Sequence, residues 1–326
     1  MKIIKISHIW TPGIGTIMAS LIFNLIKNLS NKKLIFVSPK NADILIIGPY
    51  NIETLSNRIF RNFSRRTNSK IIKNFIENFQ QSLFMRRSQP LKIFLCHENF
   101  RYNTVEADFS ISFDLGVNNE NHLRIPVWKE NIDWSKYGIV RNNLDYANIS
   151  RFGSFYNLAD LIQPQGDDFL NKKNICIFTS HMNEPRKTIY EEFSKNFIVD
   201  GFGPYFDKRI KNHNSSHFTK KEIMKNYSFN LCPHNCIYPG IYEEKVPEAF
   251  LSKCLPITWA DQNISHDFNP GSFINLNDHI KDNFKEIIYL LKQREFLQKF
   301  TNKPLLLSEP NLDKEIKFTK KILDCL

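Results

Sequence analysis

The residues best suited to chemistry lie in a stretch that begins at Tyr227 and ends at Asp278. Within it, Glu243, Glu244 and Lys245 fall in the expected first turn of a helix. Backbone N–H groups in a first turn lack intrahelical acceptors and the helix dipole is positive there, so a diphosphate is a natural ligand. Lys245 adds a point charge for a phosphate oxygen, and either carboxylate can accept hydrogen bonds from sugar hydroxyls. The alternative is that both acids only complement the helix dipole.

The elements that must position these residues alternate between strand and helix patterns. In the first half, strands are expected at 1–6, 33–37, 42–47, 91–96 and 109–113, and helices at 14–29 and 51–82. In the second half, strand-like runs occur at 174–179, 197–200, 227–232, 255–259 and 272–276, with helices at 185–196, 219–226, 243–253, 278–300 and from 311 onward. This alternation is typical of parallel sheets with helices on both faces. We therefore predict an α/β fold with two Rossmann-like domains facing a cleft.

The pattern loosens around residues 140–172, where Asn, Gly and Pro accumulate, and we place the linker there. The predicted domains are an N-terminal α/β domain at 1–150 and a C-terminal α/β domain at 151–305, two units that would suit a donor and an acceptor. A final helix at 306–326 is expected to pack back on the N-terminal domain.

Length and composition restrict the class of protein. The chain has 326 residues, with 44 Lys+Arg against 33 Asp+Glu, which gives a formal charge of +11. A hydrophobic content of 42% is enough for a large core and argues against a disordered tail protein. The positive charge favours anionic partners, namely nucleic acid, a membrane surface or a phosphate-bearing substrate, without choosing among them.

The six cysteines form no C-x-x-C pair and several lie in apolar runs, which indicates free thiols in a reducing compartment. Cys232 and Cys236 flank His234, but no second pair with zinc-ligand spacing follows. The run from Ile17 to Leu29 is too short and too polar to span a bilayer, and no signal-peptide cleavage site follows it.

The sequence contains no Asp-x-Asp triplet that would hold a divalent metal between phosphates. We therefore expect a mechanism that needs no metal, in which positive side chains take over the role of the cation. His8, His266 and the pair His213 and His217 are expected to be polar surface or loop.

One basic run stands out in the expected helix at 51–82. It contains Arg61, Arg65, Arg66, Lys70 and Lys73. The run is interpreted as a solvated helix face, with anionic lipid, lipopolysaccharide or nucleic acid as alternative contacts.

Several blocks occur in an order that resembles the α1,3-fucosyltransferases of glycosyltransferase family 10, the bacterial enzymes in particular. The blocks are Cys96-His97-Glu98-Asn99, residues 107–114, residues 123–128, Phe178-Thr179-Ser180-His181 with Arg186, residues 229–232 with Asn235 and Glu244-Lys245, residues 255–259, and residues 267–275. Each block alone is weak, but their shared order is specific. The resemblance is close over residues 90–280 and loose at the N-terminus.

The resemblance implies a GT-B architecture, GDP-fucose as the donor, and inversion at the anomeric carbon by single displacement. It carries the role of general base over to Glu98, whose pKa we expect partial burial to raise. Arg186 and Lys245 would hold the diphosphate and stabilise the departing GDP. Glu244 would bind fucose or steady the charge that builds on its ring, and Asn235 would reach the nucleoside.

The chain departs from the family pattern at two places in the donor signature. Pro233-His234-Asn235 stands where the family usually has Phe-Glu-Asn, so an imidazole replaces a carboxylate. Ile241-Tyr242-Glu243-Glu244-Lys245 stands where Tyr-Val-Thr-Glu-Lys is usual, so that stacking on the base passes to Tyr242 or is lost. Both changes leave a different nucleotide sugar open as the donor.

The predicted function is transfer of L-fucose from GDP-fucose to a glycan hydroxyl, O3 of N-acetylglucosamine in a bacterial surface polysaccharide. The partners are then GDP-fucose and the glycan, with no nucleic acid and no required cofactor. The alternatives are the same fold with another nucleotide sugar, and a basic nucleic-acid-binding protein without catalysis. A cytoplasmic location is expected, with peripheral association at the anionic inner membrane as a further expectation.

Overall fold

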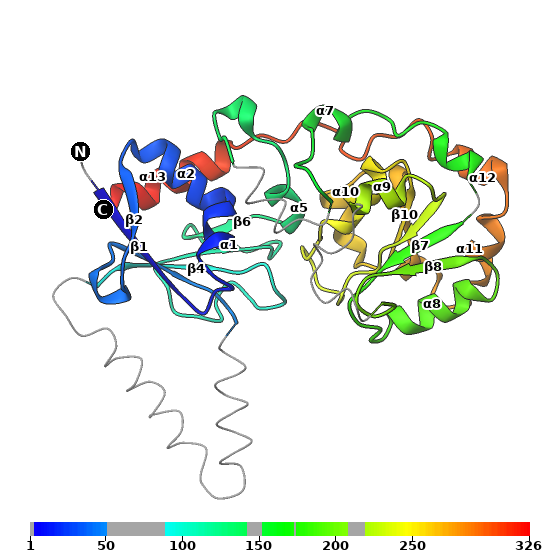
Figure 1. The fold of residues 1–326 in the computed structure, drawn as a ribbon, viewed down its shortest axis with the longest axis horizontal. Coiled ribbons are helices and arrows are strands. Elements are labelled where there is room, and N and C mark those ends of the chain that lie inside the picture. Colours follow the sequence, from blue (N-terminus) through cyan, green and yellow to red (C-terminus); the bar gives the residue numbers. More distant parts are fainter. Residues whose placement is uncertain (1–2, 51–88, 142–151, 173, 208–218) are drawn as a thin grey trace, which may run out of the picture. The chain divides into compact units, whose positions relative to one another are not determined.

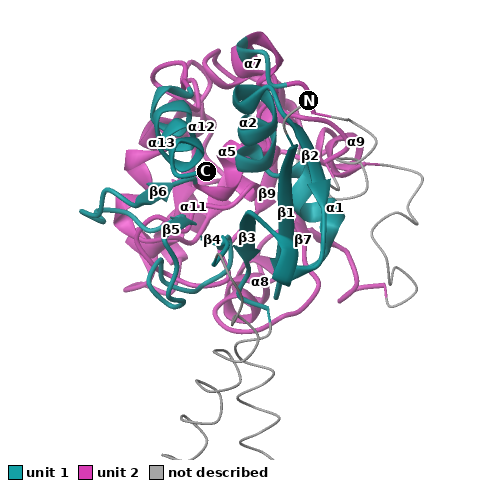
Figure 2. Cartoon of the chain, turned by 90° about the vertical axis from the view of Figure 1, so that its left-hand side faces the viewer, with its two compact units in different colours: residues 1–125, 137–139, 312–326 teal, residues 126–136, 140–311 magenta. Residues whose placement is uncertain are grey.

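The computed structural model describes residues 3–50, 89–141, 152–172, 174–207 and 219–326. The chain divides into two compact units, shown in different colours in Figure 2. Unit 1 comprises residues 1–125, 137–139 and 312–326, and unit 2 comprises residues 126–136 and 140–311. The expected helix at 51–82 with its basic run, and the pair His213 and His217, lie outside the described residues.

Unit 1 is built on a six-stranded parallel sheet with the strand order β2-β1-β3-β4-β5-β6 (Figure 1). The strands are β1 (Ile3–Ile9), β2 (Lys33–Phe36), β3 (Ile44–Ile47), β4 (Leu91–Leu95), β5 (Phe109–Ser112) and β6 (His122–Arg124). Every residue of β3 and of β5 is buried. Burial on both faces is the behaviour expected of central strands in a parallel sheet.

The N-terminal helical segment of unit 1 consists of two helices, α1 (Ile14–Ala19) and α2 (Leu21–Ser30), rather than the single helix expected over 14–29. Ser20 separates them because its backbone is extended, and its side chain caps α2 by accepting a hydrogen bond from the Phe23 N–H. Because the helix is interrupted at Ser20, α2 can adopt the orientation that buries its apolar face.

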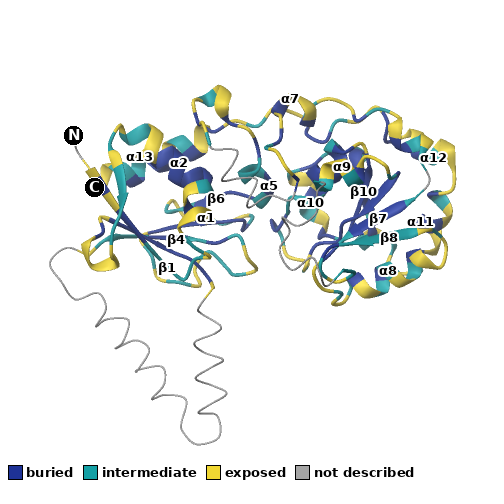
Figure 3. Ribbon diagram, viewed as in Figure 1, coloured by how far each residue is buried: buried dark blue, intermediate teal, exposed yellow. Residues whose placement is uncertain are grey.

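The last helix, α13 (Asp313–Asp324), completes the core of unit 1. It packs against α2 and β6, and its Phe318 and Ile322 belong to the same buried cluster as the sheet residues. The Phe318 ring meets Phe109 edge-on, with 5.5 Å between ring centroids. Figure 3 shows the buried stripe of α13 facing the unit and its exposed face turned outward.

Unit 2 contains a five-stranded parallel sheet with the order β11-β10-β9-β7-β8. The strands are β7 (Ile175–Phe178), β8 (Val199–Phe202), β9 (Phe229–Leu231), β10 (Leu255–Thr258) and β11 (Ile274–Asn275). The helices are α5 (Val127–Glu130), α7 (Leu158–Leu161), α8 (Arg186–Ser194), α9 (Lys220–Met224), α10 (Lys245–Leu251), α11 (Lys285–Leu290) and α12 (Arg294–Gln298). Aliphatic strand residues and aromatic residues from the helices and loops form one core.

Single turns of 3₁₀ helix connect these elements. They are η1 (Pro39–Asn41), η2 (Ser135–Tyr137), η3 (Asp168–Asn171), η4 (Gln262–His266), η5 (Pro270–Ser272) and η6 (Leu276–His279). Among the described residues, no helix combines the length and the apolar character that crossing a membrane requires.

The predicted α/β class with two parallel sheets is confirmed, but some elements differ from the expectation. Strand β6 was not expected, because only one of its three residues is buried and apolar. The region 278–300 is not one helix, since Asn283 and Phe284 adopt left-handed backbone angles that end the preceding turn. The chain leaves unit 1 at residue 125 and returns to it at residue 312, whereas the expected domains divided at 150 and 305.

Candidate functional site

The carboxyl ends of the unit 2 strands bring several polar side chains to one edge of the sheet. All strands of this sheet are parallel, so the loops after β7, β9 and β10 leave from the same edge. Thr179 follows β7 directly, Asn235 lies four residues beyond β9, and Asp261 lies three residues beyond β10. Open α/β sheets bind their ligands at this edge, which makes it the candidate site of unit 2.

Arg186 is held at this edge by side chains and backbone from two loops. It is the first residue of α8 and is 6% exposed. Its Nη1 donates to Thr179 Oγ1 and to the His181 carbonyl, both at 2.8 Å, and its Nη2 donates to Asn235 Oδ1. Burial lowers the pKa of Arg186, and the nearby Glu243 carboxylate opposes that shift. The guanidinium is thus a buried, oriented cation.

Glu243 links the other predicted residues to Arg186. Its Oε1 accepts a hydrogen bond from Asn235 Nδ2 at 3.2 Å, and its Oε2 forms an ion pair with Lys245 Nζ. The Lys245 side chain is 17% exposed, so its ammonium remains within reach of solvent. We refer to Arg186, Asn235, Glu243 and Lys245 as the Glu243 cluster. It places two cations and an amide in one hydrogen-bonded group.

Glu244 lies at the N-cap of α10 and is half-buried. Its carbonyl accepts hydrogen bonds from the Glu248 N–H at 3.0 Å and from the Tyr156 hydroxyl at 3.4 Å. No described residue forms a hydrogen bond or ion pair with its carboxylate. The Glu244 carbonyl therefore takes part in the hydrogen bonding of α10, while its carboxylate is available to a ligand.

Tyr242 was expected either to provide the stacking surface for the base or to leave that stacking lost. Its ring is fully buried, and its hydroxyl donates to Asp261 Oδ1 at 2.8 Å. Burial and the Asp261 carboxylate both raise the pKa of Tyr242. Since the ring presents no exposed face to a base in this structure, its contact with Asp261 ties the start of α10 to the loop after β10.

His234 occupies the centre of this region without a hydrogen bond. It is 1% exposed, and no described residue bonds either ring nitrogen. Its Nδ1 lies 3.8 Å from Glu243 Oε2, and its ring meets Tyr242 edge-on at 6.3 Å. Burial, aided by the Lys245 charge, lowers the pKa of His234 to about 3. The imidazole is therefore neutral at physiological pH.

Glu98, the expected general base, belongs to unit 1 and lies three residues beyond β4. Its side chain is exposed, in contrast to the partial burial that we expected. The Tyr50 hydroxyl donates to Glu98 Oε1 at 3.0 Å. The structure thus brings Arg186, Asn235 and Lys245 together in unit 2 and positions Glu98 on a separate sheet.

Several residues that contact the predicted site, Thr179, Asp261 and Tyr50 among them, were not among the predicted site residues. Thr179 contacts Arg186, Asp261 contacts Tyr242, and Tyr50 contacts Glu98. Each of the three lies one to three residues beyond the end of a parallel strand. A position just beyond the end of a strand can be recognised in the sequence, so it could have identified these three residues.

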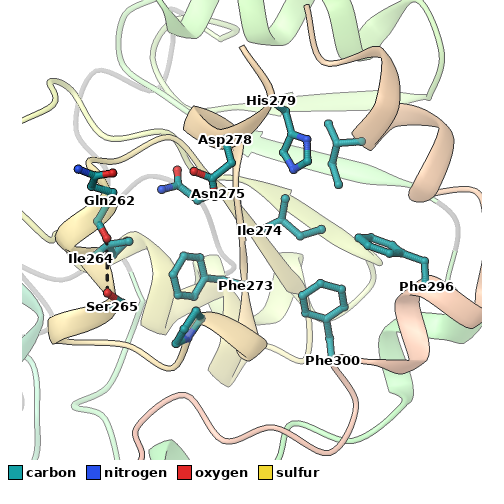
Figure 4. A pocket seen from close by; sticks show the side chains of 12 residues that line it. Gln262, Ile264, Ser265, Phe273, Ile274, Asn275, Asp278, His279, Phe296 and Phe300 are labelled. Carbon is teal, nitrogen blue, oxygen red and sulfur yellow. Dashed lines mark hydrogen bonds between the residues drawn. The ribbon is translucent and has the colours of Figure 1, made fainter. Parts of the chain in front are cut away.

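A cavity of about 240 Å³ is also present in unit 2 (Figure 4). Phe273, Phe296 and Phe300 contribute aromatic walls, and Asn275 contributes a polar one. The Asn275 amide bonds both the N–H and the C=O of Ala260 at 3.1 Å. None of the predicted site residues lines this cavity, so it is separate from the Glu243 cluster.

The cysteines are free thiols, as expected. Cys96, Cys176, Cys232 and Cys254 are buried, and burial raises the pKa of Cys232 to about 12. Within the described residues, no group of three or more His, Cys, Asp or Glu side chains is arranged to hold a metal ion.

Comparison with known proteins shows what the second half of the chain is similar to. Residues 170–302 match the family model described as glycosyltransferase family 10 (fucosyltransferase), C-terminal part. An α-(1,3)-fucosyltransferase of Helicobacter pylori is 28% identical over 218 residues, which cover 62% of this chain and 43% of the relative. A putative fucosyltransferase of Acanthamoeba polyphaga mimivirus is 27% identical over 131 residues, 37% of this chain and 21% of the relative. The match thus spans less than half the length of these relatives.

Solved structures resemble the whole chain. A crystal structure of an α1,3-fucosyltransferase has a TM-score of 0.64 at 20% identity, covering 99% of this chain and 90% of that chain. A crystal structure of an α1,3-fucosyltransferase with GDP-fucose also has a TM-score of 0.64, at 19% identity, with the same coverage. At this identity the likeness establishes the fold, and it confirms the predicted GT-B type with two parallel α/β sheets.

Proposed function

Because residues 170–302 match the model of glycosyltransferase family 10, we propose that the chain transfers L-fucose from GDP-fucose to a glycan hydroxyl. The acceptor that we favour is O3 of N-acetylglucosamine in a bacterial surface polysaccharide. The observation that carries the proposal is the Glu243 cluster, which presents two cations at the carboxyl edge of a parallel sheet. A nucleoside diphosphate is the ligand that such an arrangement suits.

In the donor complex, Arg186 and Lys245 bind the diphosphate. The guanidinium is already oriented by Thr179 and Asn235, so little side-chain entropy is lost when it binds a phosphate oxygen. Lys245 exchanges its ion pair with Glu243 for a phosphate oxygen. Glu244, whose carboxylate is available, accepts hydrogen bonds from fucose, and Asn235 contacts the nucleoside. Tyr242 supports this surface from behind through Asp261.

The reaction is a single displacement with inversion. The acceptor oxygen forms a bond to the anomeric carbon of fucose while the bond from that carbon to the β-phosphate oxygen breaks. Glu98 takes the proton of the acceptor hydroxyl, and GDP leaves with the electron pair of the broken bond. Arg186 and Lys245 stabilise the charge that develops on the leaving phosphate. No divalent metal is required in this scheme, because the two cations supply the positive charge.

The donor is tested by thermal unfolding in the presence of nucleotides. GDP or GDP-fucose at 100 times its dissociation constant is expected to stabilise the protein by about 2.7 kcal/mol. A larger shift with another nucleotide sugar would support the second donor candidate, which His234 in place of a carboxylate and the buried Tyr242 ring favour. No stabilisation by GDP or GDP-fucose would contradict the proposal.

The base is tested by Glu98→Gln, which retains the shape of the side chain and removes its basicity. We expect unchanged GDP binding and transfer reduced by roughly a hundredfold or more. Glu106→Gln is the matched control, because Glu106 is an exposed carboxylate of the same unit. Near-normal turnover of Glu98→Gln would remove Glu98 as the base.

The proposed place of action is the cytoplasmic side of the inner membrane. The formal charge of +11 supports peripheral attraction to anionic lipid there.

A further inference from the structure

Tyr50 and Glu98 leave neighbouring strands of unit 1 at equivalent positions. Strands β3 and β4 are paired in parallel, with Ile47 opposite Phe94. Tyr50 lies three residues beyond the end of β3, and Glu98 lies three residues beyond the end of β4. The parallel pairing therefore brings the two side chains to the same edge, where the Tyr50 hydroxyl donates to Glu98 Oε1 at 3.0 Å.

The position of Tyr50 is fixed by the loop that follows β1. The Tyr50 N–H donates to the Trp10 carbonyl at 3.0 Å, and Trp10 adopts a left-handed backbone with φ of 56°. Gly48 makes this approach possible, since a Cβ at Gly48 would lie 2.3 Å from the Trp10 carbonyl oxygen. A strained residue held by a close backbone contact is a feature that concentrates at functional sites.

The loop that carries Glu98 is fixed from the other side. The Glu98 carbonyl accepts hydrogen bonds from the Phe100 N–H at 2.6 Å and from Cys96 Sγ at 3.3 Å. Three residues beyond Glu98, Arg101 pairs with the buried Asp114 at 2.7 Å. The backbone on both sides of the Tyr50–Glu98 contact is therefore held, although both side chains are exposed.

We propose that Tyr50 is a positioning residue for Glu98 in the transfer reaction, an inference that rests on the proposed function. The tyrosine hydroxyl holds Oε1 and thereby sets the rotamer of the carboxylate. Among the described residues, none forms a hydrogen bond with Oε2, which leaves that oxygen to take the proton of the acceptor hydroxyl. A base oriented by a third group is a recurrent arrangement in enzymes that activate a hydroxyl.

The proton that Tyr50 donates stays on the tyrosine throughout the reaction. Partial desolvation of its hydroxyl and the adjacent Glu98 charge both raise the pKa of Tyr50, so the phenol remains protonated. Tyr50 therefore acts through the orientation of the Glu98 carboxylate and exchanges no proton with it.

Tyr50→Phe, which removes only the hydroxyl, is the test. We expect kcat to fall about tenfold to a hundredfold, the effect of one hydrogen bond to a charged group. GDP affinity and the thermal midpoint are expected to stay unchanged. The KM values for donor and acceptor are expected to stay unchanged while kcat falls, a split that a merely structural role would not produce. Tyr289→Phe is the matched control, because Tyr289 is 63% exposed and belongs to unit 2.

A second variant tests the same contact with the hydroxyl retained. Gly48→Ala places a methyl group against the Trp10 carbonyl and should displace Tyr50, so we expect the same fall in kcat at unchanged KM. If Glu98→Gln loses transfer while Tyr50→Phe matches the wild type at every pH, this inference is wrong and the proposed function stands. If the wild type transfers no fucose, or Glu98→Gln is fully active, both are wrong.

Discussion

His234 shows how a single residue of the candidate site affects the whole unit. Its ring is buried, and both nitrogens lack hydrogen-bond partners among the described residues. A buried polar group without a partner costs about 1–3 kcal/mol, so this position is held at the expense of stability. The nearby Glu243 carboxylate, 3.8 Å from Nδ1, is the group that would accept a hydrogen bond from the neutral imidazole if Lys245 moved to a phosphate.

The pH dependence of stability tests the state of His234. Its pKa is lowered from 6.5 to about 3 in the folded protein, so the unfolded chain binds a proton that the folded one does not between those values. The contribution of neutral His234 to the free energy of unfolding is present above pH 6.5 and is lost as the pH falls. The free energy of unfolding then changes with pH at a slope that approaches about 1.4 kcal/mol per pH unit. Between pH 6.5 and pH 5 this amounts to about 2 kcal/mol.

Chemical denaturation of His234→Phe at pH 7 and pH 5 measures this contribution. On acidification, we expect the free energy of unfolding of the wild type to fall by about 2 kcal/mol more than that of the variant. His266→Phe serves as the control, because His266 is exposed in the same unit, and its acid response is expected to match the wild type. Equal acid responses of His234→Phe and the wild type would show that His234 is not held neutral.

At the scale of elements, α13 is the segment whose role is most easily measured. Phe318 is buried against Phe109, and Ile322 is fully buried in the same core. The helix joins a core whose other members lie before residue 126, so its packing energy depends on contacts far apart in sequence.

Phe318→Ala should destabilise unit 1 by about 3–5 kcal/mol, the usual cost of removing a buried phenylalanine ring. Lys320→Ala, an exposed change on the same helix, should alter stability by less than about 0.5 kcal/mol. Urea denaturation followed by circular dichroism measures both. A similar small effect of the two variants would mean that α13 does not contribute to the core.

At the scale of the whole molecule, the chain crosses between units and returns. Residues 312–326 belong to unit 1, although the preceding 140–311 belong to unit 2. The Glu243 cluster lies entirely within unit 2, whereas Glu98 and Tyr50 lie within unit 1. Loss of structure in unit 1 should therefore abolish transfer while donor binding by unit 2 is retained.

Truncation after residue 311 tests this division. It removes α13, so we expect unit 1 to lose its cooperative unfolding transition while unit 2 retains GDP affinity within about twofold. Transfer should be lost, because the proposed base lies in the damaged unit. Calorimetric unfolding and titration with GDP measure these effects. A truncated chain with wild-type transfer would contradict the assignment of residues 312–326 to the core of unit 1.

The α/β class, most strands and the resemblance to glycosyltransferase family 10 were accessible from the sequence by itself. Short apolar runs such as Ile44–Ile47 are recognisable because both faces of a central parallel strand are buried. The resemblance rested on the order of short blocks, and the places of Arg186, Asn235 and Lys245 within those blocks made these residues candidates for the site. Patterns of this kind depend on residues that are close in sequence, so they can be recognised without knowing which distant residues contact one another.

The tertiary structure alone decided which residues meet. Glu243 joins Asn235 and Lys245 because a loop and a helix start converge at one sheet edge, and Tyr50 reaches Glu98 across 48 residues of sequence. The burial of Tyr242 and the exposure of Glu98, both contrary to expectation, depend on the packing of segments that sequence spacing does not relate. Side-chain chemistry is local, but burial and hydrogen-bond partners are set by the strand order that brings distant loops to one edge.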